Sequence, residues 1–151
     1  MADTSINDIK TKIMDRISTD ITTCQDVSNY EKSGFDGYPA VTVICSGNEN
    51  DYWSTAENKR QFSFVIRVYQ QIENKPDLGD LTDNAKERAE AIMGRVVSEI
   101  IDSFDEYYDL GGTVDYCRAV PSAWGYVKIE NGFCRTAEIK IIAIKTFLAV
   151  I

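Results

Sequence analysis

Carboxylates, lysines, tyrosines and four cysteines are the side chains that could act as a general acid or base in this chain, because it contains no histidine. Without histidine there is no Ser-His-Asp or Cys-His pair and no histidine metal site. The sequence also lacks the GxGxxG, GKS or GKT, GxSxG and EF-hand patterns. We therefore expect no catalytic residues, no cofactor and no metal, and we expect that the protein is not an enzyme.

The cysteines are widely spaced along the chain, at Cys24, Cys45, Cys117 and Cys134. They form no CxxC pattern, so a zinc site is not expected. Cys45 and Cys134 lie inside strand-like runs, where a free cysteine behaves as a small apolar residue. We expect reduced thiols in a cytoplasmic setting.

Acidic side chains gather at the end of a long predicted helix, at Asp102, Asp105, Glu106 and Asp109. The helix dipole favours cations there, so each carboxylate costs about 0.3 kcal/mol or more. One interpretation is a solvated acidic surface that keeps the protein soluble. The alternative is that this acidity faces a basic partner, or a channel that DNA must pass without binding.

Aromatic residues in polar segments are the candidates for partner contacts. Residues 46–59 form a 14-residue polar segment with Tyr52 and Trp53 in its middle. We predict a long loop there, in which the two rings either fold back onto the core or contact a partner. Trp124, just after Pro121, and Asn131, in a hairpin turn, are further candidates for subunit or partner contacts.

The element on which the other predictions depend is a helix over residues 82–108. Its apolar residues recur at steps of three and four and share one face: Ala85, Ala89, Ile92, Met93, Val96, Ile100 and Phe104. Thr82, Asp83 or Asn84 can cap its start, and Gly111-Gly112 stops the chain after it. A stripe this wide needs a sheet or another helix to cover it.

Other segments supply that cover. Ile6, Ile9, Ile13, Ile17 and Ile21 predict a first helix over residues 4–22, followed by an irregular segment over 26–38. Strands are predicted over residues 40–45, 60–71, 113–120, 123–129 and 133–150, with an Asn131-Gly132 hairpin turn. The order α-β-β-α-β-β predicts an α+β fold, in which an antiparallel or mixed sheet of four to five strands carries both helices on one face.

Length and charge narrow the class of protein. The chain has 151 residues, which suits a single domain over residues 1–151. Its 24 acidic and 16 basic residues give a net charge of -8, which argues against a nucleic-acid-binding surface. We expect no signal peptide in the first residues, and we expect the apolar residues 139–151, with Lys140 and Lys145 among them, to be too few to span a membrane.

Four segments carry a resemblance to a known family. Residues 37–43, Gly-Tyr-Pro-Ala-Val-Thr-Val, give a Tyr-Pro-x-Val entry into the first strand. The strand Gln-Phe-Ser-Phe-Val-Ile-Arg-Val-Tyr over 61–69, the helical Glu-Ala-Ile-Met over 90–93 and the apolar run over 139–144 follow it. In this order the chain resembles the tail terminator, or tail completion, proteins of long-tailed bacteriophages.

The resemblance implies a structural protein of the virion tail, assembled in the host cytoplasm. Its subunits would form a homohexameric ring that caps the tail tube, stops tube growth and offers a joint to the head connector. The tail tube protein and the head connector protein would be its partners, with DNA only passing through a channel and no membrane involved. Two alternatives stay open: another head–tail joining protein, or a small ligand-binding α+β module with an apolar pocket.

Overall fold

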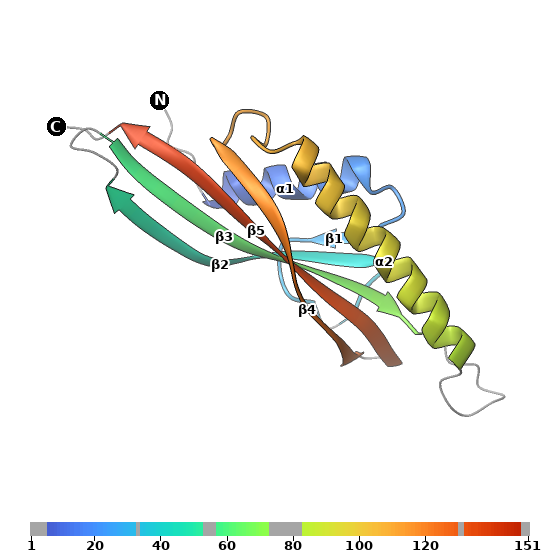
Figure 1. The fold of residues 1–151 in the computed structure, drawn as a ribbon. Helices are drawn as coiled ribbons and strands as arrows, with labels where there is room; N and C mark the ends of the chain where they lie inside the picture. The colour runs from blue at the N-terminus through green and yellow to red at the C-terminus, as the bar shows by residue number, and fades with distance from the viewer. Residues whose placement is uncertain (1–5, 33, 53–56, 73–82, 130–131, 149–151) are drawn as a thin grey trace.

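The computed structural model describes residues 6–32, 34–52, 57–72, 83–129 and 132–148. Two helices and five strands follow one another along the chain (Figure 1): α1 Ile6–Asp20, β1 Asp26–Ser28, β2 Ala40–Tyr52, β3 Glu57–Gln71, α2 Asp83–Glu106, β4 Tyr116–Ile129 and β5 Gly132–Leu148. This arrangement confirms the predicted α+β class, with a mixed sheet and both helices on one face.

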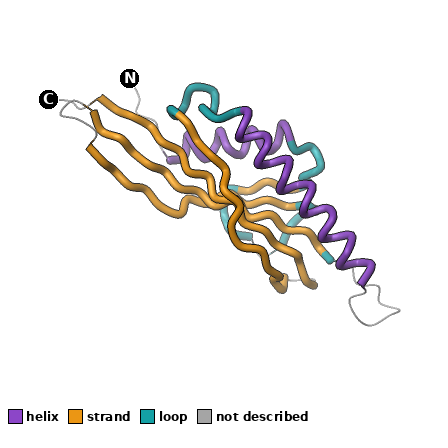
Figure 2. Tube along the Cα trace, in the orientation of Figure 1, coloured by secondary structure: helices purple, strands orange, loops and turns teal. Residues whose placement is uncertain are grey.

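The sheet has the strand order β1-β2-β3-β5-β4. β1 runs parallel to β2, whereas the other neighbours are antiparallel. β3 and β5 lie in the interior of the sheet and pair along their length, from Glu57 opposite Leu148 to Gln71 opposite Cys134. At one end, β2, β3 and β5 extend beyond both helices (Figures 1 and 2).

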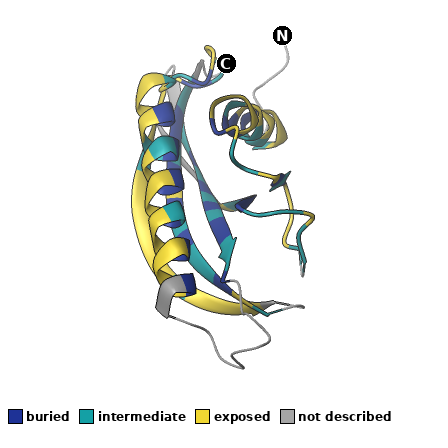
Figure 3. Ribbon diagram, turned by 90° about the vertical axis from the view of Figure 1, so that its right-hand side faces the viewer, coloured by how far each residue is buried: buried dark blue, intermediate teal, exposed yellow. Residues whose placement is uncertain are grey.

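The core lies between the helices and one face of the sheet. Alternate residues of β3 and β5 point to that face, as strand geometry requires, and they are fully or almost fully buried: Phe62, Phe64, Ile66, Val68, Ala137, Ile139, Ile141 and Ala143. The apolar stripes of α1 and α2 cover them, including Ile9, Ile13, Ile17, Met93, Val96, Ile100 and Phe104. Figure 3 shows the exposed residues of α2 on the side turned away from the sheet.

The predicted loop over residues 46–59 is wrong. β2 continues through Tyr52 and β3 begins at Glu57, with Asn48 opposite Phe62 and Tyr52 opposite Asn58. The polar residues of this stretch give no apolar alternation, so the sequence did not indicate the strands. Backbone pairing to β3 forms the strand here, in a part of the sheet that extends past the helix layer.

Two other predicted boundaries also change. Residues 26–28 form the short strand β1 within the segment predicted as irregular, and three residues are too few for a periodic pattern. The two strands predicted on either side of Pro121 are one strand, β4, in which the register shifts between Pro121 and Trp124. Pro121 therefore marks a bulge in an edge strand, a position that tolerates its missing N–H.

A polar contact joins the two helices. Ser103, buried on α2, accepts a hydrogen bond from Arg16 Nε at 3.0 Å and donates one to Asp20 Oδ2 at 2.7 Å. Arg16 also pairs with Asp20 at 2.9 Å and lies 4.5 Å from the centre of the Tyr107 ring. One buried hydroxyl therefore fixes α1 against the C-terminal half of α2.

Substituting Ser103→Ala should lower the free energy of unfolding by about 1 kcal/mol, because Arg16 and Asp20 each lose a hydrogen bond in a partly buried site. Ser98→Ala on the exposed side of α2 is the matched control, and it should change stability by less than about 0.5 kcal/mol. Urea unfolding of both variants measures the difference. Equal stabilities would show that the helix–helix contact does not depend on this hydroxyl.

Candidate interaction surface

Exposed apolar side chains are concentrated on the β4–β5 hairpin. Of the eight large apolar residues that the described chain leaves exposed, six lie there: Tyr116, Val120, Trp124, Tyr126, Val127 and Phe133. The strand register places Trp124, Tyr126 and Phe133 on the helix side of the sheet, whereas Tyr116, Val120 and Val127 lie on the side away from the helices. Single exposed apolar residues are ordinary, but a group of them on one side of an element indicates a contact surface. Tyr and Trp are also the residue types most enriched at interfaces.

Arg135 of β5 holds two of these rings in place. Its guanidinium carbon lies 5.1 Å from the ring centre of Trp124 and 4.7 Å from that of Tyr126. Its Nε donates to Glu90 of α2 at 2.7 Å, and its Nη1 donates to the carbonyl of Gly125 at 3.1 Å. The hydrogen bond with Glu90 raises the pKa of Arg135 above its ordinary value. Trp, Tyr and Arg in one cluster have the composition of a binding hot spot.

The backbone edge of β4 is poorly suited to adding another strand. The N–H of Cys117 already donates to the carbonyl of Tyr108 at 2.6 Å, and Pro121 has no N–H to offer. The register shift after Pro121 further disrupts a regular edge. Bulges and prolines are common means of protecting edge strands. Contacts at this hairpin should therefore be made by side chains.

The sheet face away from the helices is covered at one end only. Phe35 and Tyr38, in the segment between β1 and β2, pack there on Ala40, Tyr69 and Cys134, with the Phe35 and Tyr69 rings 4.7 Å apart. Arg67 on the same face is neutralised by Glu31 at 2.9 Å and by Glu138 at 2.7 Å. The rest of this face has no covering element among the described residues.

Asp26 anchors that covering segment. Its carboxylate pairs with Lys32 at 3.0 Å and accepts hydrogen bonds from the Asp36 N–H at 3.1 Å and from Ser28 Oγ at 3.0 Å. Burial disfavours the charged form, but these hydrogen bonds outweigh it, so the pKa of Asp26 lies below its ordinary value.

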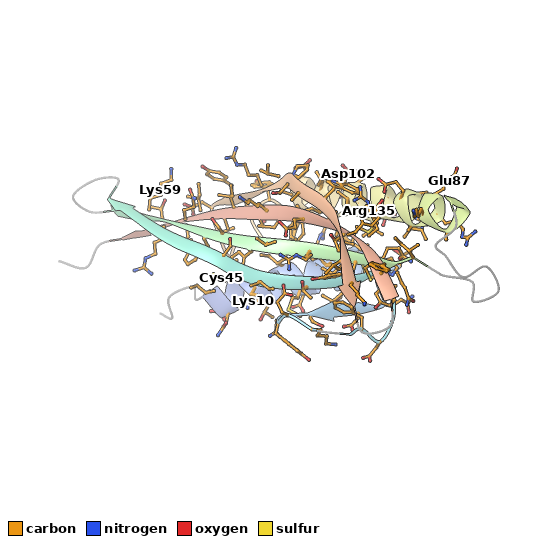
Figure 4. The ribbon with its side chains drawn as sticks, turned by 90° about the horizontal axis from the view of Figure 1, so that it is seen from below. Lys10, Cys45, Lys59, Glu87, Asp102 and Arg135 are labelled. Carbon is orange, nitrogen blue, oxygen red and sulfur yellow. The ribbon has the colours of Figure 1, made fainter. Side chains whose placement is uncertain are left out.

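The four predicted acidic residues lie together at one end of the helix layer. Asp102, Asp105 and Glu106 are exposed on the last turns of α2, and Asp109 is half-buried in the turn that follows. Figure 4 labels Asp102 on α2, with Lys59 at the far end of the sheet. Among the described residues, Arg16 at 4.0 Å from Glu106 is the one cation within ion-pairing distance of this group. Their role as a channel lining stays a prediction.

The predicted aromatic contacts have different outcomes. Trp124 lies on the exposed hairpin with 39% of its surface accessible. Tyr52 ends β2, but its side chain is outside what the structure describes, as are Trp53 and Asn131 altogether. Sequence reasoning missed Tyr126, Phe133 and Arg135. In the paired strands, Tyr126 alternates with Gly125, and Phe133 and Arg135 alternate with Cys134. This alternation could have indicated that the three residues share one side of the hairpin.

Three of the four cysteines, Cys24, Cys117 and Cys134, are poor candidates for nucleophiles. Burial raises the pKa of Cys117 to about 12, with smaller contributions from Asp109 and Asp105. Burial likewise raises the pKa of Cys24 and of Cys134 to about 11. Thiols with such pKa values stay protonated near neutral pH and are weak nucleophiles. Within the described ranges, no group of three or more Cys, Asp and Glu residues is arranged to hold a metal ion.

Two depressions lie on the helix side of the molecule. One is lined by Gln70, Gln71, Ala85, Arg88, Ala89 and Ile92, and the other by Lys12, Asp15, Arg16, Thr19 and Tyr107. Neither brings a thiol together with a base, as nucleophilic catalysis would need. In the part of the chain that is described, neither helix is long and apolar enough to cross a membrane.

Comparison with protein-family models finds no match for this chain, and comparison with curated protein sequences finds none either.

Substituting Asp26→Asn should lower the free energy of unfolding at pH 7 by about 1–3 kcal/mol, because a charged acceptor of several hydrogen bonds is lost. The folded-state pKa of Asp26 is depressed, so its contribution is complete above about pH 4 and is lost as the pH falls further. The gap between wild type and variant should therefore narrow below pH 4.

Urea unfolding at pH 7 and at several lower pH values measures this gap. Asp15→Asn, on the exposed side of α1, is the control and should stay within about 0.5 kcal/mol of wild type at pH 7. A gap for Asp26→Asn that is independent of pH would contradict the role assigned to its ionised carboxylate.

Proposed function

We propose that this protein is a structural subunit of a bacteriophage tail, a tail terminator. It forms a homohexameric ring that caps the tail tube, stops its growth and provides the joint to the head connector. The observation that carries the proposal is the group of exposed apolar and aromatic side chains on one hairpin, around Trp124, Tyr126 and Arg135. Such a surface fits a protein that works through contacts with other proteins.

Other features support a role in assembly over a role in catalysis. The sequence has no histidine, and the thiols at Cys24, Cys117 and Cys134 are held protonated by burial. The sheet also extends beyond its two helices, so part of its surface is not covered by them. Such a surface suits a subunit that is covered by its neighbours on assembly. The order of elements is the α-β-β-α-β-β order on which the resemblance rests, apart from the added short β1.

The direct test adds the purified chain to tail tubes while they lengthen from tube subunits. A terminator should stop lengthening at a fixed ratio of protein to tube ends and leave a ring-shaped cap, both visible by electron microscopy. Trp124→Ala should weaken capping about tenfold or more, because hot-spot truncations cost 2 kcal/mol or more. Tyr30→Ala, an exposed ring away from the hairpin, is the matched control and should cap normally.

Tubes that lengthen at an unchanged rate under saturating protein would refute the terminator role. Binding to head connectors without any effect on tube growth would instead favour another head–tail joining protein. Binding of a small molecule in the depression beside Ala85 and Arg88, with no effect on tubes, would favour the ligand-binding module.

A further inference from the structure

We infer that the uncovered face of the sheet receives the acidic end of α2 from a second copy of this chain. This inference rests on the proposed ring-forming function and names the two surfaces that would join its subunits. We call the first surface the open sheet face and define it as Ile44, Val65, Arg118, Val120, Lys140 and Ile142. We call the second the acidic helix end and define it as Ser98, Asp102, Asp105 and Glu106.

The strand register places the six residues of the open sheet face together. Ile44 lies opposite Val65, which lies opposite Lys140, which lies opposite Val120. In the next row of that face, Ile142 lies opposite Arg118. Residues paired directly across strands point to the same side of the sheet. They alternate with the core residues Phe64 and Ile141, so this side is the one away from the helices.

This face carries apolar surface and unbalanced positive charge. Ile44, Val65 and Ile142 are half-buried and belong to none of the core clusters of the described chain, and Val120 is exposed. Within the described ranges, no carboxylate lies within 4.0 Å of the Arg118 or Lys140 charge, whereas Arg67 farther along has two. A surface with unpaired cations fits a partner that presents carboxylates.

The charges of this acidic chain are strongly segregated. β3, β4 and β5 hold eight of its 16 basic residues and only two of its 24 acidic residues. α2 has the opposite balance, with seven acidic and three basic residues. At its C-terminal end, no described cation lies within 4.0 Å of Asp102 or Asp105. The two surfaces are complementary, and apart from Glu106, which lies 4.0 Å from Arg16, their charges have no ion-pair partner within the described chain.

Their sizes are compatible. The four strands that form the open sheet face are about 15 Å across, since neighbouring strands lie about 4.8 Å apart. A helix about 10 Å wide can therefore lie on them. Because the two surfaces differ, the contact is head-to-tail, and repeated contacts of this kind close into a ring when the rotation permits. In such a ring each sheet is covered by its own helices on one face and by a neighbour's α2 on the other.

The experiment reverses the charge of each surface separately. One variant carries Arg118→Glu and Lys140→Glu, and the other carries Asp102→Lys and Asp105→Lys. Light scattering over a range of protein and salt concentrations measures the mass of each. Either variant alone should associate about tenfold or more weakly than wild type, because it brings like charges together. Lys12→Glu with Lys86→Glu is the control for the sheet variant, because it makes the same change in net charge on exposed helix positions.

Mixing the two variants should restore association, since each open sheet face then meets a helix end of opposite charge. A single chain that carries all four substitutions should also assemble. This rescue separates a lost contact from a lost fold, because a misfolded variant would not recover on mixing. Wild-type association should weaken as salt rises from about 0.1 to 1 M, because the Debye length falls from about 10 to 3 Å.

Each outcome decides a definite point. The assigned interface would be overturned if both charge-reversed variants still formed the wild-type oligomer. It would also be overturned if they lost the oligomer and mixing them did not restore it. Neither outcome would affect the proposed function. A wild-type chain that stays monomeric at every concentration would overturn docking of a second copy. The tube-capping test is read from tube lengths, so it still decides the proposed function independently. A reversal of the open sheet face that abolishes capping but not self-association would assign that face to the tube.

Discussion

The ladder between β3 and β5 is the constraint on which the rest of the structure depends. It pairs the fifteen residues of β3 without interruption, which corresponds to about 50 Å of strand. The helices are shorter, about 36 Å for the 24 residues of α2 and about 22 Å for the 15 residues of α1. The helix layer therefore cannot cover the full length of even one sheet face. Among the described residues, only the segment around Phe35 and Tyr38 covers the other face.

This shortage of cover explains where apolar residues are exposed. The side of β3 that meets the helices is fully buried at Phe64 and Ile66, but on the other side Val65 keeps part of its surface accessible. β4, at the edge, carries exposed Trp124 and Tyr126 in the part of the strand that follows the register shift at Pro121. Its backbone edge is nevertheless protected by the Cys117–Tyr108 hydrogen bond and by Pro121. The chain thus limits edge-to-edge aggregation while leaving side-chain surfaces available for contact.

The sequence could predict the helices and strands whose apolar residues recur at regular intervals over a long stretch. The stripe from Ala85 to Phe104 predicted α2 within two residues at each end, and the alternation of Phe62 to Val68 predicted the buried side of β3. Residues 46–52 carry no apolar alternation, so the sequence predicted a loop there. The partners of Arg135 lie on β4 and α2, and the grouping of Arg135 with Trp124 and Glu90 depends on strand register and helix placement. No local pattern encodes those relations.

The separation of charge between sheet and helix follows from the same geometry. A strand buried on one side can place cations such as Arg118 and Lys140 only on its other side, and a helix covering the sheet can place carboxylates only on its outer surface. Charges such as those of Arg118 and Asp102 are then held apart within one subunit by the thickness of the core, whereas Arg135 lies on the helix side of β5 and pairs with Glu90 at 2.7 Å. The proposed head-to-tail contact would bring the separated charges together, so the fold favours that contact electrostatically.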